Sequence, residues 1–196
     1  MQRRHGNWAS LPSIGGMAGM LAPIVVFATI IIAAALYGSF SWSANFLSDF
    51  GVGKYGFVYN LGIMGAGVLS LIFSMGFILK FKARVWGGAL AVASMAGIAT
   101  SIFSENMPLI HYVFSMLFFL LFPIAILATS IGNRFIPFFL RAVGILAGSG
   151  ALLLSFSIYI TNLLSLNPIG SAESELLEIT FISIWISIIG ACMYLK

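Results

Sequence analysis

The amino-acid sequence predicts an all-α integral membrane protein, a bundle of six spanning helices with both termini in the cytoplasm. Composition is the first observation, because the chain is 61% hydrophobic and only 7% charged. A soluble domain carries roughly 25% charged residues. The apolar residues also form continuous runs of about the length that crosses a bilayer, without the alternation of a β-barrel. Finally, the basic residues gather in alternate connections, as the positive-inside rule requires.

Each apolar run is expected to form one helix, because in lipid a helix satisfies its own backbone hydrogen bonds. The first run begins near Met20 and ends before a polar loop, and the second lies between that loop and Lys80. The third follows Arg84. The fourth contains Pro123, the fifth is rich in glycine, and the sixth follows a short acidic segment. The predicted helices are 20–40, 56–79, 85–103, 109–131, 138–163 and 176–195, which makes residues 1–196 a single transmembrane domain.

Charges of opposite sign are expected at opposite ends of the bundle. With six helices, eight of the nine basic residues fall on the side of the two termini, and only Lys54 falls on the other side. The positive-inside rule makes the basic side cytoplasmic, so a nucleic-acid partner is not needed to explain these residues. All five acids fall on the outer side: Asp49, Glu105, Glu173, Glu175 and Glu178.

The first external loop, SWSANFLSDFGVGKYG, is the least apolar stretch between two spans. We expect a short interfacial helix over about 44–50, capped by Ser43 or Asn45 and ended by Gly51 or Gly53. This loop is either a solvated connection or one wall of an outer pocket.

Small residues at four-residue spacing predict close helix packing. Ala89, Ala93 and Gly97 form such a stripe in the third helix, and Gly144 and Gly148 form one in the fifth. These faces are expected to pack inside the bundle or against a membrane-protein partner or a second copy.

Several polar residues are expected at the same depth near the outer surface. His111 is a candidate general base or acid. Asp49 or Glu178 is a candidate to orient its ring or to join it on a divalent metal. Ser115 lies four residues after His111, so both can share a helix face and form a nucleophile and base. The alternative is that Ser115 bonds to its own helix and that Glu105 and Glu178 favour helix N-termini. The ligand-binding candidates are Ser48, Asp49, Asn60, Glu105, His111, Asn162 and Glu178.

Other chemistries are disfavoured by the residues present. The two histidines, His5 and His111, fall on opposite sides, and no zinc motif or phosphate loop occurs. No metal and no cofactor is expected. No charged residue lies at the centre of a predicted helix, which disfavours an ion-coupled pump.

A family resemblance accompanies these features. LSDFG (47–51), YNLG (59–62), SIFSENMPLIH (101–111) and a phenylalanine-rich fourth helix resemble the prokaryotic six-helix membrane proteins called domain of unknown function 998. Ser48, Asp49 and Gly51 match its loop, and Asn60 and His111 match its polar positions. Phe103 is followed by Ser104, where the family commonly has Phe-Pro. The resemblance implies a prokaryotic cell membrane, and it implies no reaction.

Three functions remain open from the sequence. The first is a non-catalytic membrane component that binds lipid or a partner protein, with a polar pocket at its outer face. The second is an outward-facing enzyme that acts on a lipid or other amphiphile through His111 and Asp49. The third is a carrier or channel for a small solute.

Overall fold

The computed structural model describes residues 10–163 and 171–195, with side chains up to 157 and from 171 onwards. In this part of the chain there are six long helices, and each contains a segment long and apolar enough to cross a membrane. The predicted all-α fold with six membrane-spanning helices is therefore confirmed. The helices are α1 (Leu11–Tyr37), α2 (Gly56–Phe81), α3 (Arg84–Ile102), α4 (Pro108–Gly132), α5 (Phe138–Leu163) and α6 (Ser171–Leu195).

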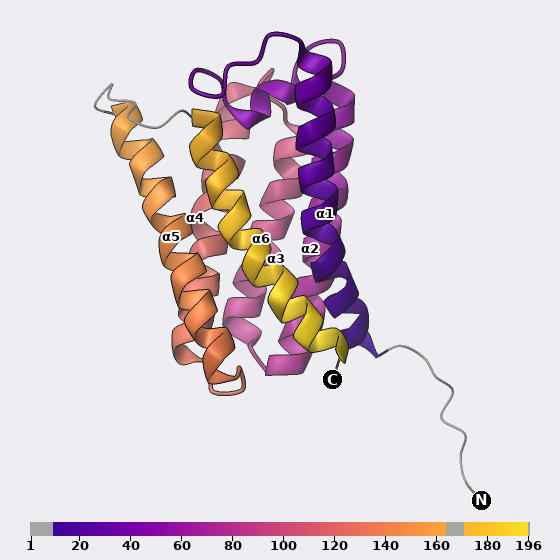
Figure 1. Ribbon diagram of the computed structural model, residues 1–196, viewed down its shortest axis with the longest axis vertical. Coiled ribbons are helices and arrows are strands. Elements are labelled where there is room, and N and C mark those ends of the chain that lie inside the picture. The colour runs from indigo at the N-terminus through magenta and orange to yellow at the C-terminus, as the bar shows by residue number, and fades with distance from the viewer. Residues whose placement is uncertain (1–9, 164–170, 196) are drawn as a thin grey trace, which may run out of the picture.

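The six helices form a closed ring (Figure 1). Each helix packs against its neighbours in the sequence, and α6 returns to pack against α1. Short connections make successive helices antiparallel, so the ring needs no crossing connection. A short 3-10 helix, η1 (Leu47–Gly51), lies between α1 and α2. The end of the bundle that carries η1 is called the η1 end below.

The two ends of the bundle carry opposite charges. At the η1 end lie Asp49, Glu105 and the three glutamates in the first turns of α6. The opposite end, where α2 and α4 end and α3 and α5 begin, carries Lys80, Lys82, Arg84, Arg134 and Arg141. The structure thus reproduces the predicted segregation of charge along the helix axes.

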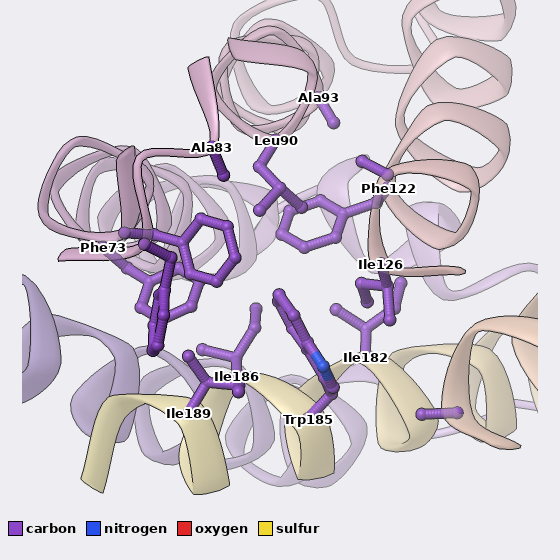
Figure 2. Packing of buried hydrophobic residues seen from close by; sticks show 14 of the residues in the cluster. Phe73, Ala83, Leu90, Ala93, Phe122, Ile126, Ile182, Trp185, Ile186 and Ile189 are labelled. Carbon is purple, nitrogen blue, oxygen red and sulfur yellow. The ribbon is translucent and has the colours of Figure 1, made fainter. Parts of the chain in front are cut away.

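Aromatic side chains fill the basic half of the ring. Trp185 points from α6 into this core, where Phe73 and Phe122 also lie (Figure 2). Its ring is 6.0 Å from Phe73 and 5.5 Å from Phe77, measured between centroids. Such contacts contribute about 0.5–1.5 kcal/mol each beyond the area they bury. This half of the ring is therefore closed by side chains.

Helix α1 begins at Leu11, about nine residues before the predicted start. Ser10 caps it by accepting a hydrogen bond from the Ser13 backbone N–H, and a proline lies in the first turn, where its missing N–H is tolerated. The glycines of this first part lower its hydropathy, so the apolar pattern does not indicate a membrane helix there. Gly15 lies against Gly76 of α2, and Gly16 lies against Gly190 of α6.

Helix α1 also ends at Tyr37, three residues before the predicted end, and two other elements differ from the prediction. The expected interfacial helix over 44–50 is the shorter η1, preceded by Phe46 instead of a capping serine or asparagine. Helix α6 begins at Ser171, five residues before the predicted start. Glutamates so close to an apolar run suggested a loop, whereas they belong to the first two turns of the helix.

The small-residue stripes pack inside the ring. Ala93 of α3 and Ala151 of α5 are fully buried. A side chain at Gly97 would meet Phe118 of α4, and one at Gly148 would meet Leu127 of α4. Both stripes thus let neighbouring helices of the same chain approach closely. A partner protein or a second copy stays a prediction.

Candidate functional site

Two adjacent cavities lie in the η1 half of the ring. The central cavity, about 110 Å³, is lined by η1 and by every helix except α5, and it extends from Ser48 and Asn60 to Phe122 and Ile186. The side cavity, about 270 Å³, lies among α4, α5, α6 and η1. Phe122 and Ile186 also belong to the aromatic core, which therefore forms the floor of the central cavity. The two cavities share Ser48, His111, Ser115, Phe119 and Glu175.

Helix η1 forms a fixed wall of this site. Its first backbone N–H, from Leu47, donates to Glu175 Oε2 of α6 at 2.7 Å. The Ser48 hydroxyl donates to Glu105. Asn60 of α2 donates its amide to the carbonyl oxygen of Gly51 at 3.0 Å. These bonds join η1 to α6, to the loop before α4 and to α2, so the predicted loop is held in place by the same polar residues that surround the site.

The carboxylate of Asp49 stabilises the loop itself. It accepts a hydrogen bond from the Asn45 amide at 2.6 Å and one from the Phe46 backbone N–H at 3.1 Å. Asp49 also lies close enough to Glu105 to affect its protonation. Among the described residues that line the two cavities, Ser48 and Glu105 are present and Asp49 is not.

The charge of Glu105 is affected by its burial and by this loop. Its pKa is raised to about 7, mainly because burial disfavours the charged form and also because Asp49 lies beside it. The Ser48 hydroxyl, which donates to Glu105, acts in the opposite direction. Near neutral pH the carboxyl group of Glu105 thus changes its charge.

Two glutamates of α6 enter the site from the opposite wall. Glu175 lines both cavities, and Glu178 lines the side cavity and is fully buried. The Ser155 hydroxyl of α5 lies 2.7 Å from Glu178 Oε1. Glu178 Oε2 is buried without a hydrogen-bond partner in the described part of the chain. A buried polar atom without a partner is costly, so Oε2 is a place where a ligand can donate a hydrogen bond.

The position of Glu178 argues against its sequence-based interpretation as an acid that favours a helix N-terminus. It is seven residues past the start of α6, about 10 Å along the axis. The effect of the helix dipole falls off within the first turn, so the dipole does not explain this residue. Glu105 lies in the loop before α4 and is held by Ser48 rather than by the first turn of that helix.

His111 and Ser115 lie together on the inner face of α4. His111 Nδ1 is 2.8 Å from the carbonyl oxygen of Phe103, and His111 Nε2 is 3.2 Å from Ser115 Oγ. Both residues are half-buried and line both cavities. The sequence-based alternative, in which Ser115 bonds to its own helix backbone, does not describe the observed contact.

Most sequence-predicted site residues therefore surround the two cavities. The side chain of Asn162 lies outside the described residues. Sequence reasoning missed Glu175, Ser155 and Tyr59 as site residues. The three-residue spacing of Glu175 and Glu178, which places both on one helix face, was the available signal for the first. Ser155 and Tyr59 have no comparable signal, because only tertiary packing brings them to the cavities.

Sequence comparison agrees with the fold. The family described as "Protein of unknown function (DUF998)" matches residues 20–191, which contain η1, the polar residues and nearly all of the six helices. The chain belongs to this family. The family resemblance seen in the sequence is confirmed, although the DUF998 description assigns no activity. No curated protein and no solved structure matches the chain significantly.

Because the DUF998 family has no assigned activity, the chemistry must be inferred from the residues of the site itself. Within the part of the chain that the structure describes, no group of three His, Cys, Asp or Glu side chains is placed to hold a metal ion. What the site does contain is carboxyl oxygens, several serine hydroxyls, a histidine and a mainly apolar inner lining. This combination suits a molecule that is apolar at one end and polar at the other.

Proposed function

We propose that this protein binds an amphiphilic molecule in the membrane, with the apolar part of the ligand inside the ring and its polar head at the η1 end. The observation that carries the proposal is the polarity of the central cavity along its length. Its depth is lined mainly by apolar side chains such as Phe122 and Ile182, with the small hydroxyls of Ser70, Ser94 and Ser183 among them, and its η1 end by Asn60 and Glu175. Ligand pockets commonly combine an apolar lining with a few convergent polar groups.

The acids determine which head group fits. Glu175 and Glu178 present carboxyl oxygens, and Glu178 Oε2 has no partner among the described residues. A hydrogen-bond-donating head, such as an ammonium or a hydroxyl, satisfies these acceptors, whereas a phosphate adds negative charge beside them. The proposed ligand is therefore an amphiphilic amine or alcohol.

A blind cavity favours binding over conduction. The aromatic core fills the basic half of the ring, and Phe122 and Ile186 form the cavity floor. A channel needs a continuous polar path, which this packing does not provide. The channel interpretation is thus disfavoured, whereas binding of an amphiphile needs no continuous path.

The orientation in the cell membrane is part of the proposal. The end opposite η1 carries Lys80, Lys82, Arg84, Arg134 and Arg141, and basic connections stay in the cytoplasm. We therefore place the η1 end outside, where it can receive molecules from the outer leaflet. Cysteine accessibility in intact cells tests this, with single cysteines at Ser43 and at Lys82 in a Cys192→Ala background.

Ligand binding is tested on purified protein in nanodiscs. We expect decylamine or decanol to raise the melting temperature and decyl phosphate to leave it unchanged. A ligand in hundredfold excess over Kd stabilises by about 2.7 kcal/mol. Ala66 lines the central cavity, so Ala66→Leu should abolish the shift, whereas Ala35→Leu, on the exposed face of α1, should retain it. Equal shifts in both variants, or no shift with any head group, would refute the proposal.

A further inference from the structure

The hydroxyl of Ser115 differs from other helix hydroxyls near the cavities. Ser94 and Ser101 donate to backbone carbonyls of Leu90 and Ile98, four and three residues earlier. This is the common arrangement for serine in a membrane helix, and it makes the hydroxyl part of the backbone hydrogen bonding. Ser115 Oγ instead lies 3.2 Å from the ring nitrogen Nε2 of His111. Ser115 thus has a side-chain base beside its hydroxyl.

The ring of His111 is oriented for that role by the backbone. Nδ1 lies 2.8 Å from the carbonyl oxygen of Phe103. A carbonyl oxygen only accepts, so Nδ1 carries the proton in this contact. In the neutral ring Nε2 is then the acceptor, and it faces the Ser115 hydroxyl. A nucleophile, a base and a third group that orients the base are the three parts of an activated serine.

The pair also lies where a substrate can reach it. His111 and Ser115 belong to the shared wall of the two cavities, together with Phe119. The side cavity is lined as well by Pro108 and Tyr112, which are exposed on the surface of α4. A hydrogen bond with a purely structural role needs no such access. The serine therefore faces the space in which the proposed amphiphile sits.

We propose that Ser115 and His111 are catalytic residues that hydrolyse a carboxylic ester of an amphiphile held in the cavities. The inference rests on the proposed function, since the cavity supplies the binding of the acyl chain. It extends that function from binding to a reaction, with an acylated amphiphilic alcohol as the substrate class. Ser115 is the nucleophile, and His111 is the general base and then the general acid.

The reaction balances with water as the only other reactant. Ser115 Oγ attacks the carbonyl carbon, and its proton passes to His111 Nε2. The ester C–O bond then breaks, and the departing alcohol takes the proton from Nε2. Water attacks the acyl-serine, again giving a proton to Nε2, and that proton returns to Ser115 Oγ as the carboxylic acid leaves. No oxidation or reduction occurs.

The test is covalent labelling of the full chain in nanodiscs with an alkyl fluorophosphonate, which forms a bond to an activated serine and releases fluoride. We expect one adduct per chain, located at Ser115 by peptide mass spectrometry. Ser115→Ala should abolish it. His111→Gln should slow it at least about a hundredfold, since a positioned general base contributes that much or more.

The matched control is Ser74→Ala. Ser74 is a buried helix serine that donates to the Ser70 carbonyl and lies outside the residues lining both cavities, so its loss should leave the labelling rate unchanged. Each variant is first compared with the wild type by gel filtration and melting temperature, so that unfolding is not read as lost chemistry. Hydrolysis of p-nitrophenyl decanoate should follow the same order among the variants.

The outcomes separate this inference from the proposed function. Labelling of Ser115 that depends on His111 supports the nucleophile–base pair even when decylamine and decanol fail to stabilise the protein. Stabilisation by these amphiphiles without labelling overturns the catalytic inference and leaves the binding function standing. Labelling that persists in Ser115→Ala also overturns it.

Discussion

The crossing of α1 with α6 can be tested by a single methyl group. Gly16 lies in the part of α1 that the sequence did not predict, and it packs on the backbone of α6. An added Cβ would lie 2.6 Å from the Gly190 carbonyl oxygen and 2.7 Å from the Tyr194 nitrogen. Because both are backbone atoms, no side-chain rotation can relieve the contact.

The expected magnitude follows from these distances. Ordinary contact begins at 3.4 Å, so the two helices must separate by about 0.8 Å to accept Gly16→Ala. A gap of that size removes a quarter to a half of the dispersion energy of the contacting atoms. Overpacking of this kind destabilises by about 1–3 kcal/mol. For a chain of this length we expect the melting temperature to fall by about 2–12 °C.

Gly88→Ala is the matched control. Gly88 also lies within a helix, α3, and nothing lies within 4 Å of its added Cβ. Alanine favours the helix over glycine by about 1 kcal/mol, so this variant should be unchanged or slightly stabilised. Melting in detergent, followed by tryptophan fluorescence, measures both. If Gly16→Ala were as stable as Gly88→Ala, the close crossing of α1 and α6 would be wrong.

Three further predictions concern the η1 end. The pKa of Glu105 is raised from 4.5 to about 7, so the folded state binds more protons in this interval and stability should fall as pH rises through it. Melting curves from pH 5 to 8 should show this slope in the wild type and a flatter one in Glu105→Gln; an equal slope would contradict it. Asn60→Ala removes the hydrogen bond to Gly51 and should destabilise the protein by about 0.5–1.5 kcal/mol in the same assay. An unchanged melting temperature would show that this hydrogen bond does not stabilise the fold. Glu178→Met removes a buried oxygen without a described partner and should leave stability unchanged or higher, while decylamine no longer raises the melting temperature. Retention of the full decylamine shift would exclude Glu178 as a ligand contact.

The spans were predictable because hydropathy is a local property. Twenty apolar residues in a row must be helical in lipid whatever surrounds them, and basic residues mark the ends. The same reasoning failed at Gly15 and Gly16, where helical residues have low hydropathy. There the helix is favoured by packing on α2 and α6, which a local pattern does not contain.

The candidate site was only partly predictable for a related reason. Depth along the bilayer placed Asn60, Glu105 and His111 at one level, and helical spacing placed Ser115 beside His111. Depth does not tell which way a side chain points around the helix axis. Asp49 was therefore expected in the pocket, yet its carboxylate bonds to its own loop.

The sequence by itself determined that this protein lies in the membrane, that it has six helices, and that its two ends carry opposite charges. These properties follow from composition and order along the chain. Only the tertiary structure decided that α6 closes the ring against α1, that Glu175 and Glu178 enter cavities, and that Ser115 meets a base. The physical reason is that ring closure and side-chain contacts depend on rotations about helix axes. Those rotations are set by packing between residues far apart in the sequence.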